Sequence, residues 1–255
     1  PGGCFDAIVC GRRYRGSDLL YRLGSEMFRR DPEFFSPERM MIVRPSDVRV
    51  WLSAGGATVP DPETRAMLLR DAATNLMRLY NGSVMELIER SEDYLIGPED
   101  LGLVERLKAF RAYMDPVEKK AFLLAKFLER RGILSIRDRN NIRIPVDNHL
   151  TRIAIRTGIV EPSSPEVFLP DSGEVSPDVD GAIRLIVRYA YKLLSELSRL
   201  DPFYIDDILW RLGRETCTYQ TPRCGICPLR ESCAAYENPT RRRLVEHSFY
   251  STWWY

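Results

Sequence analysis

Apolar residues recur every three or four positions along most of the chain, which is the pattern of helices with one buried face. The strongest run covers 62–82; it opens at Pro62 and closes at Gly82, residues typical of a helix start and stop. The same period predicts further helices over 17–30 (capped by Ser17 or Asp18), 117–132, 148–160, 181–200 and 202–215. We therefore expect a mostly α-helical fold.

Two segments break this helical period. Residues 48–61 alternate apolar and polar positions around Gly55-Gly56, and residues 133–146 place two short apolar runs around Asn140-Asn141. Both patterns predict short β-hairpins. No stretch approaches the roughly 18 consecutive apolar residues of a membrane span, so we expect no membrane association.

Composition places the chain among ordinary globular proteins, with 255 residues, 44% hydrophobic and 29% charged. That length allows one large domain or two smaller ones. The net charge is only +1, but 104–156 holds 13 Lys and Arg against 6 Asp and Glu, a surplus of +7. This segregation indicates either a face for a polyanion or a set of solvated helix faces, and charge alone does not choose between them.

Four of the six cysteines, Cys217, Cys224, Cys227 and Cys233, fall within seventeen residues, with the spacing C-x6-C-x2-C-x5-C. The N-terminus lacks the pattern of a secretory signal, so clustered cysteines favour metal ligation over disulfides. We expect an intracellular protein, in the cytoplasm and associated with the nucleoid, or in the nucleus. Four thiolates suit either tetrahedral zinc or an iron–sulfur cube. Only one C-x2-C knuckle is present, whereas a zinc ribbon usually has two.

Candidates for catalysis are few. With only two histidines, His149 and His247, the chain offers no Ser-His-Asp triad, which leaves an activated lysine or a carboxylate. Asp147 directly precedes a predicted helix, and an ordinary N-cap is the simplest interpretation of it. Lys119 and Lys120 are equally compatible with solvated charges, and His149 with capping or packing.

Three segments together resemble the helix-hairpin-helix DNA glycosylases. "LGRETCTYQTPRCGICPLRESC" (212–233) is similar to the cluster loop of endonuclease III and its adenine-glycosylase relatives, including the flanking glycine, arginine and proline residues. "IPVDNHLTRIAIRTGIV" (144–160) resembles the family's Pro-Val-Asp-x-His segment, and "DPVEKKAFLLAKFL" (115–128) lies where the family has its hairpin and lysine.

The resemblance implies a two-lobed glycosylase fold and a [4Fe-4S] cluster on Cys217, Cys224, Cys227 and Cys233. It implies that Lys120 attacks C1′ of an extruded nucleotide, with Lys119 as the second choice, and that Asp147 stabilises the cationic sugar. The expected partner is double-stranded DNA with a damaged base, bound by a monomer. The division it implies is a helical barrel over 36–146, a cluster domain of 1–35 with 147–236, and a tail over 237–255.

The chain also departs from the family. The hairpin glycines that let backbone N–H groups approach a phosphate are absent from "MDPVEKKA" (114–121), and extra residues separate the lysine from the aspartate. We therefore expect phosphate contacts from other cations: Lys119, Arg137, Arg139, Arg143 and, in the cysteine loop, Arg223. The choice of base, and of DNA over RNA, stays open.

Two other classes of protein compete with a base-excising glycosylase and AP lyase. One is a non-catalytic iron–sulfur protein of the same fold that only binds nucleic acid. The other is a helical binding module stabilised by zinc.

Overall fold

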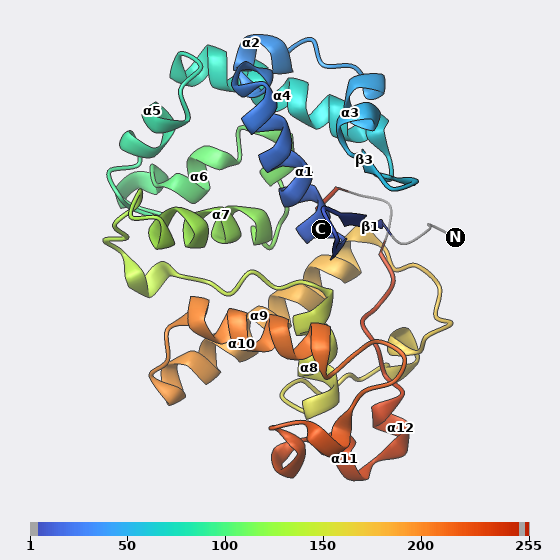
Figure 1. Cartoon of the computed structure of the whole chain (residues 1–255). Coiled ribbons are helices and arrows are strands. Elements are labelled where there is room, and N and C mark those ends of the chain that lie inside the picture. Colours follow the sequence, from blue (N-terminus) through green and yellow to red (C-terminus); the bar gives the residue numbers. More distant parts are fainter. Residues whose placement is uncertain (1–4, 250–252, 255) are drawn as a thin grey trace. The chain divides into compact units, whose positions relative to one another are not determined.

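A computed structural model describes residues 5–249 and 253–254. The chain packs into two compact units: one comprises Pro1–Arg90 with Ala109–Ala112, and the other Ser91–Lys108 with Tyr113–Tyr255. Figure 1 shows the helices of each unit along the chain. The predicted division into 36–146, 1–35 with 147–236, and 237–255 stays a prediction, and its tail includes residues 250–252 and 255, which lie outside the described part.

The first unit is helical with two small hairpins. Its elements are β1 (Asp6–Val9), β2 (Arg12–Arg15), α1 (Ser17–Arg30), η1 (Pro32–Phe35), α2 (Pro37–Met40), α3 (Pro45–Trp51), β3 (Ser53–Ala54), β4 (Ala57–Thr58), α4 (Pro62–Tyr80) and α5 (Val84–Glu89). Strands β1 and β2 pair antiparallel, as do β3 and β4. The core is formed where α1, α3 and α4 bury Leu19, Val48 and Ala66.

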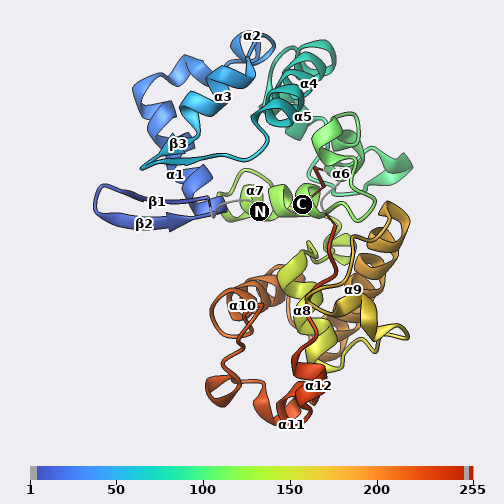
Figure 2. The ribbon, with the colours of Figure 1, turned by 90° about the vertical axis from the view of Figure 1, so that its right-hand side faces the viewer.

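The second unit carries every candidate site residue. Its helices are α6 (Leu103–Leu107), α7 (Lys119–Arg130), α8 (Asn148–Thr157), α9 (Pro177–Ser198), α10 (Pro202–Glu215), α11 (Ala234–Glu237) and α12 (Pro239–Arg242). Its short 3-10 turns are η2 (Pro98–Asp100), η4 (Arg139–Asn141), η5 (Pro165–Phe168), η6 (Cys224–Ile226) and η7 (Arg230–Ser232), and η3 (Arg111–Tyr113) crosses from the first unit. Helices α8, α9 and α10 lie side by side and bury Leu150, Tyr191 and Leu209 between them (Figure 2).

Most predicted helices are confirmed, with small shifts at their ends. The helices over 17–30 and 202–215 have the predicted bounds, although the first is capped by Gly16 rather than by Ser17 or Asp18. The helix over 62–82 ends at Tyr80, because Asn81 and Gly82 both take positive φ, at 48° and 76°. The mostly α-helical fold class is likewise confirmed. Among the described residues, no helix is long and apolar enough to span a bilayer.

One predicted hairpin is confirmed and the other is wrong. Within 48–61, β3 and β4 pair around Gly55-Gly56, although 48–51 belongs to α3. Residues 133–146 contain no strand; Asn140 and Asn141 lie in η4 instead. The reason is that Asp138 accepts hydrogen bonds from the backbone N–H groups of residues 95–97, at 2.7 to 3.3 Å, so a side chain replaces a strand ladder.

Candidate active site and cysteine loop

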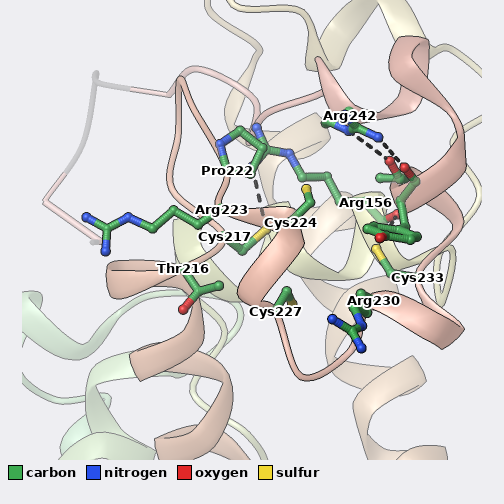
Figure 3. A pocket seen from close by; sticks show the side chains of 12 residues that line it. Arg156, Thr216, Cys217, Pro222, Arg223, Cys224, Cys227, Arg230, Cys233 and Arg242 are labelled. Carbon is green, nitrogen blue, oxygen red and sulfur yellow. Dashed lines mark hydrogen bonds between the residues drawn. The ribbon is translucent and has the colours of Figure 1, made fainter.

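The four clustered cysteines line one cavity, as the spacing predicts (Figure 3). Cys217 lies two residues after the end of α10, Cys224 opens η6, and Cys227 and Cys233 are the first residues after η6 and η7. Short backbone hydrogen bonds shape this irregular loop: Cys217 N donates to Leu212 O at 2.7 Å and Cys227 N to Cys224 O at 3.1 Å. All four thiols are free rather than joined in disulfides.

The four thiols are a donor set that either a zinc ion or an iron–sulfur cube could use. Burial, together with the other cysteines of the loop, raises the pKa values of Cys227 and Cys233. Four neighbouring thiolates therefore need a strong positive charge among them. In the part of the chain that the structure describes, no three His, Cys, Asp or Glu side chains are close enough to share one metal ion. Four thiols at one cavity match the ligand set of a tetrahedral zinc site and also that of an iron–sulfur cube, in which each cysteine binds its own iron.

Two arginines of α8 connect the cysteine loop to the Asp147 segment, and sequence reasoning missed both. Arg152 Nε donates to Cys217 O at 2.8 Å and its Nη2 to Gly213 O at 2.8 Å. Arg156 donates to Thr218 O and Tyr219 O, each at 2.7 Å, and to Cys217 Sγ at 3.5 Å. Both side chains are buried, so these two of the 13 cations in 104–156 bind groups inside the protein and are not part of a charged surface. The sequence feature that could have identified them is their spacing of four residues, which places both on one face of the helix.

Asp147 is the N-cap of α8, as predicted. Its carboxylate accepts from Leu150 N at 3.0 Å, directly after the buried pair Pro145-Val146. Nearby, burial raises the pKa of Asp206 to about 6, against the opposing charge of Lys126, with which it forms a buried ion pair. The charge of Asp147 contributes to this rise, so the two carboxylates interact electrostatically.

His149 packs against α10, as expected from the sequence. Its ring stacks on Trp210 with centroids 6.2 Å apart, and burial lowers its pKa. Helix α10 can approach this closely because it carries Gly213 there: a Cβ at that position would lie 2.7 Å from His149 Cβ.

Gly213→Ala should therefore destabilise the protein by about 1–3 kcal/mol, because neither of the colliding atoms is the end of a flexible side chain. The matched control is Gly181→Ala in α9, where an added Cβ meets nothing within 4 Å. That variant should be neutral or up to about 1 kcal/mol more stable, since alanine is the better helix former. Thermal unfolding of both variants measures the difference, and equal melting temperatures would contradict the close approach.

The segment before α7 is a tight turn that contains no glycine. Hydrogen bonds to Asp115 hold its backbone in place. Asp115 accepts from Val117 N and Lys119 N, both at 3.0 Å, and Glu118 N donates to Asp115 O at 2.9 Å. Glu118 itself takes a left-handed φ of 56°. Its buried carboxylate pairs with Lys108, Arg143 and Arg188. The backbone N–H groups of Val117, Glu118 and Lys119 therefore all donate to Asp115, inside the protein.

Lys119 and Lys120 open α7, both half-buried. Lys119 contributes its backbone N–H to Asp115, whereas the Lys120 ammonium donates to the backbone oxygen of Trp253. Lys120 and Asp147 therefore stand at the starts of two helices in the same unit, each held by a defined polar contact.

The predicted phosphate-binding cations have diverse surroundings. Arg139 pairs with Glu129 and Asp201, and Arg143 with Glu118, so both are neutralised inside the unit. Arg137 is exposed and lies over the Tyr94 ring at 4.7 Å. Arg223 is exposed, and Figure 3 shows its side chain pointing away from the cysteines.

We compared the sequence and the structure of this chain with those of known proteins. No known family profile matches the chain. The chain is similar to a solved structure of a trapped covalent endonuclease III–DNA intermediate, with TM-score 0.54 and 16% identity over 87% of this chain and 78% of that one. The chain has the endonuclease III fold. The glycosylase fold that the sequence resemblance implies is thereby confirmed.

Two curated proteins share sequence with parts of this chain. An adenine DNA glycosylase of Schizosaccharomyces pombe is 46% identical over 50 residues, which make up 18% of this chain and 10% of that protein. The transcriptional activator DEMETER of Arabidopsis thaliana is 24% identical over 174 residues, or 66% of this chain and 7% of that protein. The chain thus spans a tenth or less of the length of these relatives.

Proposed function

We propose that this protein is a DNA glycosylase that removes a damaged or modified base and then cleaves the strand through a lysine Schiff base. The observation behind the proposal is that one unit of an endonuclease III fold has Lys120 at the start of α7 and Asp147 at the cap of α8. A similar fold is known from a covalent protein–DNA intermediate, and an adenine DNA glycosylase shares a segment with this chain.

The proposed reaction needs a neutral lysine amine. The Lys120 nitrogen lone pair attacks C1′ of an extruded nucleotide, the N-glycosidic bond breaks, and the base leaves with that bond's electron pair and accepts a proton. Opening of the sugar ring and loss of the amine's extra proton give the Schiff base. Loss of a C2′ proton then expels the 3′ phosphate. The carboxylate of Asp147 stabilises the positive charge that develops on the sugar.

The partner in this proposal is double-stranded DNA. The candidates for backbone contact are half-buried Lys119 and the exposed Arg137 and Arg223, because Arg139 and Arg143 are already paired with carboxylates. The four cysteines would hold a [4Fe-4S] cluster, which ties the loop after α10 into one unit.

A panel of duplexes, each with one damaged or modified base, tests the proposal and identifies the substrate. Strand cleavage without alkali shows glycosylase and lyase activity together, and cleavage only after hot alkali shows base removal alone. Binding without any cleavage across the panel would favour the non-catalytic nucleic-acid-binding protein instead.

Cys224→Ser should remove most of the bound iron, because three thiolates hold a cube poorly, and the second unit should melt at a lower temperature. The matched control is Cys10→Ser, which changes an exposed free cysteine outside the loop. Iron and sulfide content, visible absorbance and thermal unfolding measure the effect. Zinc without iron or sulfide in the purified wild-type protein would overturn the cluster.

A further inference from the structure

The described residues after α12 belong to the second unit. We call residues 244–249 and 253–254 the tail. Val245 N donates to Phe168 O at 2.7 Å, and Val175 N donates to Ser248 O at 2.9 Å. The start of the tail is therefore tied by backbone hydrogen bonds to the loop between α8 and α9.

A chain of four buried side chains anchors the tail to the turn before α7. His247 Nε2 lies 2.8 Å from Asp180 Oδ1, Asp180 binds Arg184 at 2.6 Å, and Arg184 reaches both oxygens of Asp115 at 2.8 and 2.9 Å. All four side chains have zero exposure. Because Asp115 also accepts from Lys119 N, the same network fixes both the tail and the first turn of α7.

The end of the tail then meets the proposed nucleophile. The Lys120 ammonium donates to Trp253 O, and the neighbouring Trp254 ring packs on buried Phe249 with centroids 5.9 Å apart. The aromatic pair thus links the last described residues of the tail to its anchored part.

This contact changes what the lysine can do. An amine attacks through its lone pair, and a hydrogen bond donated to a carbonyl favours the protonated form that has none. We propose that the tail is a built-in cover of the lysine site: the Trp253 carbonyl positions Lys120 as an ammonium until an entering nucleotide displaces it. Trp253 is thus a positioning residue that acts through its main chain. The consequence for catalysis rests on the proposed function, but the cover itself does not.

Lysine labelling tests the cover without DNA. Only five lysines exist, at 108, 119, 120, 126 and 192, so reductive methylation followed by peptide mass spectrometry resolves each one. In the wild type, Lys120 should react about tenfold more slowly than its half-buried neighbour Lys119, since a hydrogen bond from a charged group is worth about that factor or more. Buried Lys126 reports unfolding, because it becomes reactive only when the fold opens.

Loosening the tail should release Lys120. Trp254→Ala removes the ring contact with Phe249 and should speed methylation of Lys120 about tenfold, with Lys119 and Lys126 unchanged. Phe249→Leu is the second variant, in case the first does not fold. Tyr204→Ala, at an exposed aromatic of α10, is the matched control and should change nothing. Equal rates for Lys119 and Lys120 in the wild type, or no response to either tail variant, would overturn the cover.

Borohydride trapping on abasic DNA, run beside the labelling, separates the two proposals. If the tail variants speed methylation of Lys120 but no variant can be trapped, the cover exists and the lysine is not a nucleophile. Trapping with no difference in labelling means that the lysine reacts and the tail does not cover it.

Discussion

We expect Lys120→Gln to abolish covalent trapping of the protein on abasic DNA by borohydride. A glutamine amide cannot form the Schiff base that the hydride reduces. The substitution should leave the fold intact, because the glutamine N–H can still donate to Trp253 O. DNA affinity should fall only slightly, so the loss appears in trapping and strand cleavage, measured on denaturing gels, while binding is followed by anisotropy.

Lys119→Gln is the control for position. It removes the same charge one residue earlier, and its structural contact to Asp115 comes from the backbone and survives. It should weaken binding slightly and retain trapping. The reverse result, with Lys119→Gln inactive and Lys120→Gln active, would move the nucleophile by one residue; if neither mattered, the lyase proposal would fail.

Asp147→Asn should reduce base excision by about 2–4 kcal/mol of barrier, a hundredfold or more, without destabilising the fold. An asparagine oxygen can accept from Leu150 N as the carboxylate does, and asparagine caps helices about as well as aspartate. What disappears is the negative charge beside the cationic sugar. Single-turnover excision rates and thermal unfolding separate these two effects.

Asp61→Asn is the matched control for this change. Asp61 caps α4 through Thr64 N at 3.1 Å, so the substitution makes the same chemical change at a cap in the first unit. Both variants should melt near the wild-type temperature, and only Asp147→Asn should lose excision. If Asp147 served only as a helix cap, both variants would keep the wild-type excision rate and melting temperature.

The features predicted from the sequence are those that depend on local rules. The cysteine spacing, the Asp147 cap and the helix over 202–215 each depend on residues close together in the chain, and the structure confirms the cap and the helix and gathers the cysteines at one cavity. The resemblance to glycosylases succeeded for a similar reason, because it rested on short continuous segments.

The errors and omissions come from contacts between distant residues. The hairpin predicted over 133–146 fails because Asp138 binds backbone amides more than forty residues earlier. Arg184 looks like any helix arginine in the sequence, yet it is fully buried between Asp115 and Asp180. The periodicity of apolar residues in a sequence does not predict which carboxylates will surround a buried cation. The contact of Trp253 with Lys120 was beyond reach for the same reason.

The separation of Lys120 from Trp253, 133 residues along the chain, also bears on the order in which the protein matures. Synthesis proceeds from the N-terminus, at about 5–20 residues per second. The four cysteines leave the ribosome together, before His247 and Trp253 exist. We therefore expect the cysteine loop to be accessible to iron while the lysine site is still open. Because Trp253 follows the other described elements of its unit along the chain, its contact with Lys120 can form only after those elements have been made.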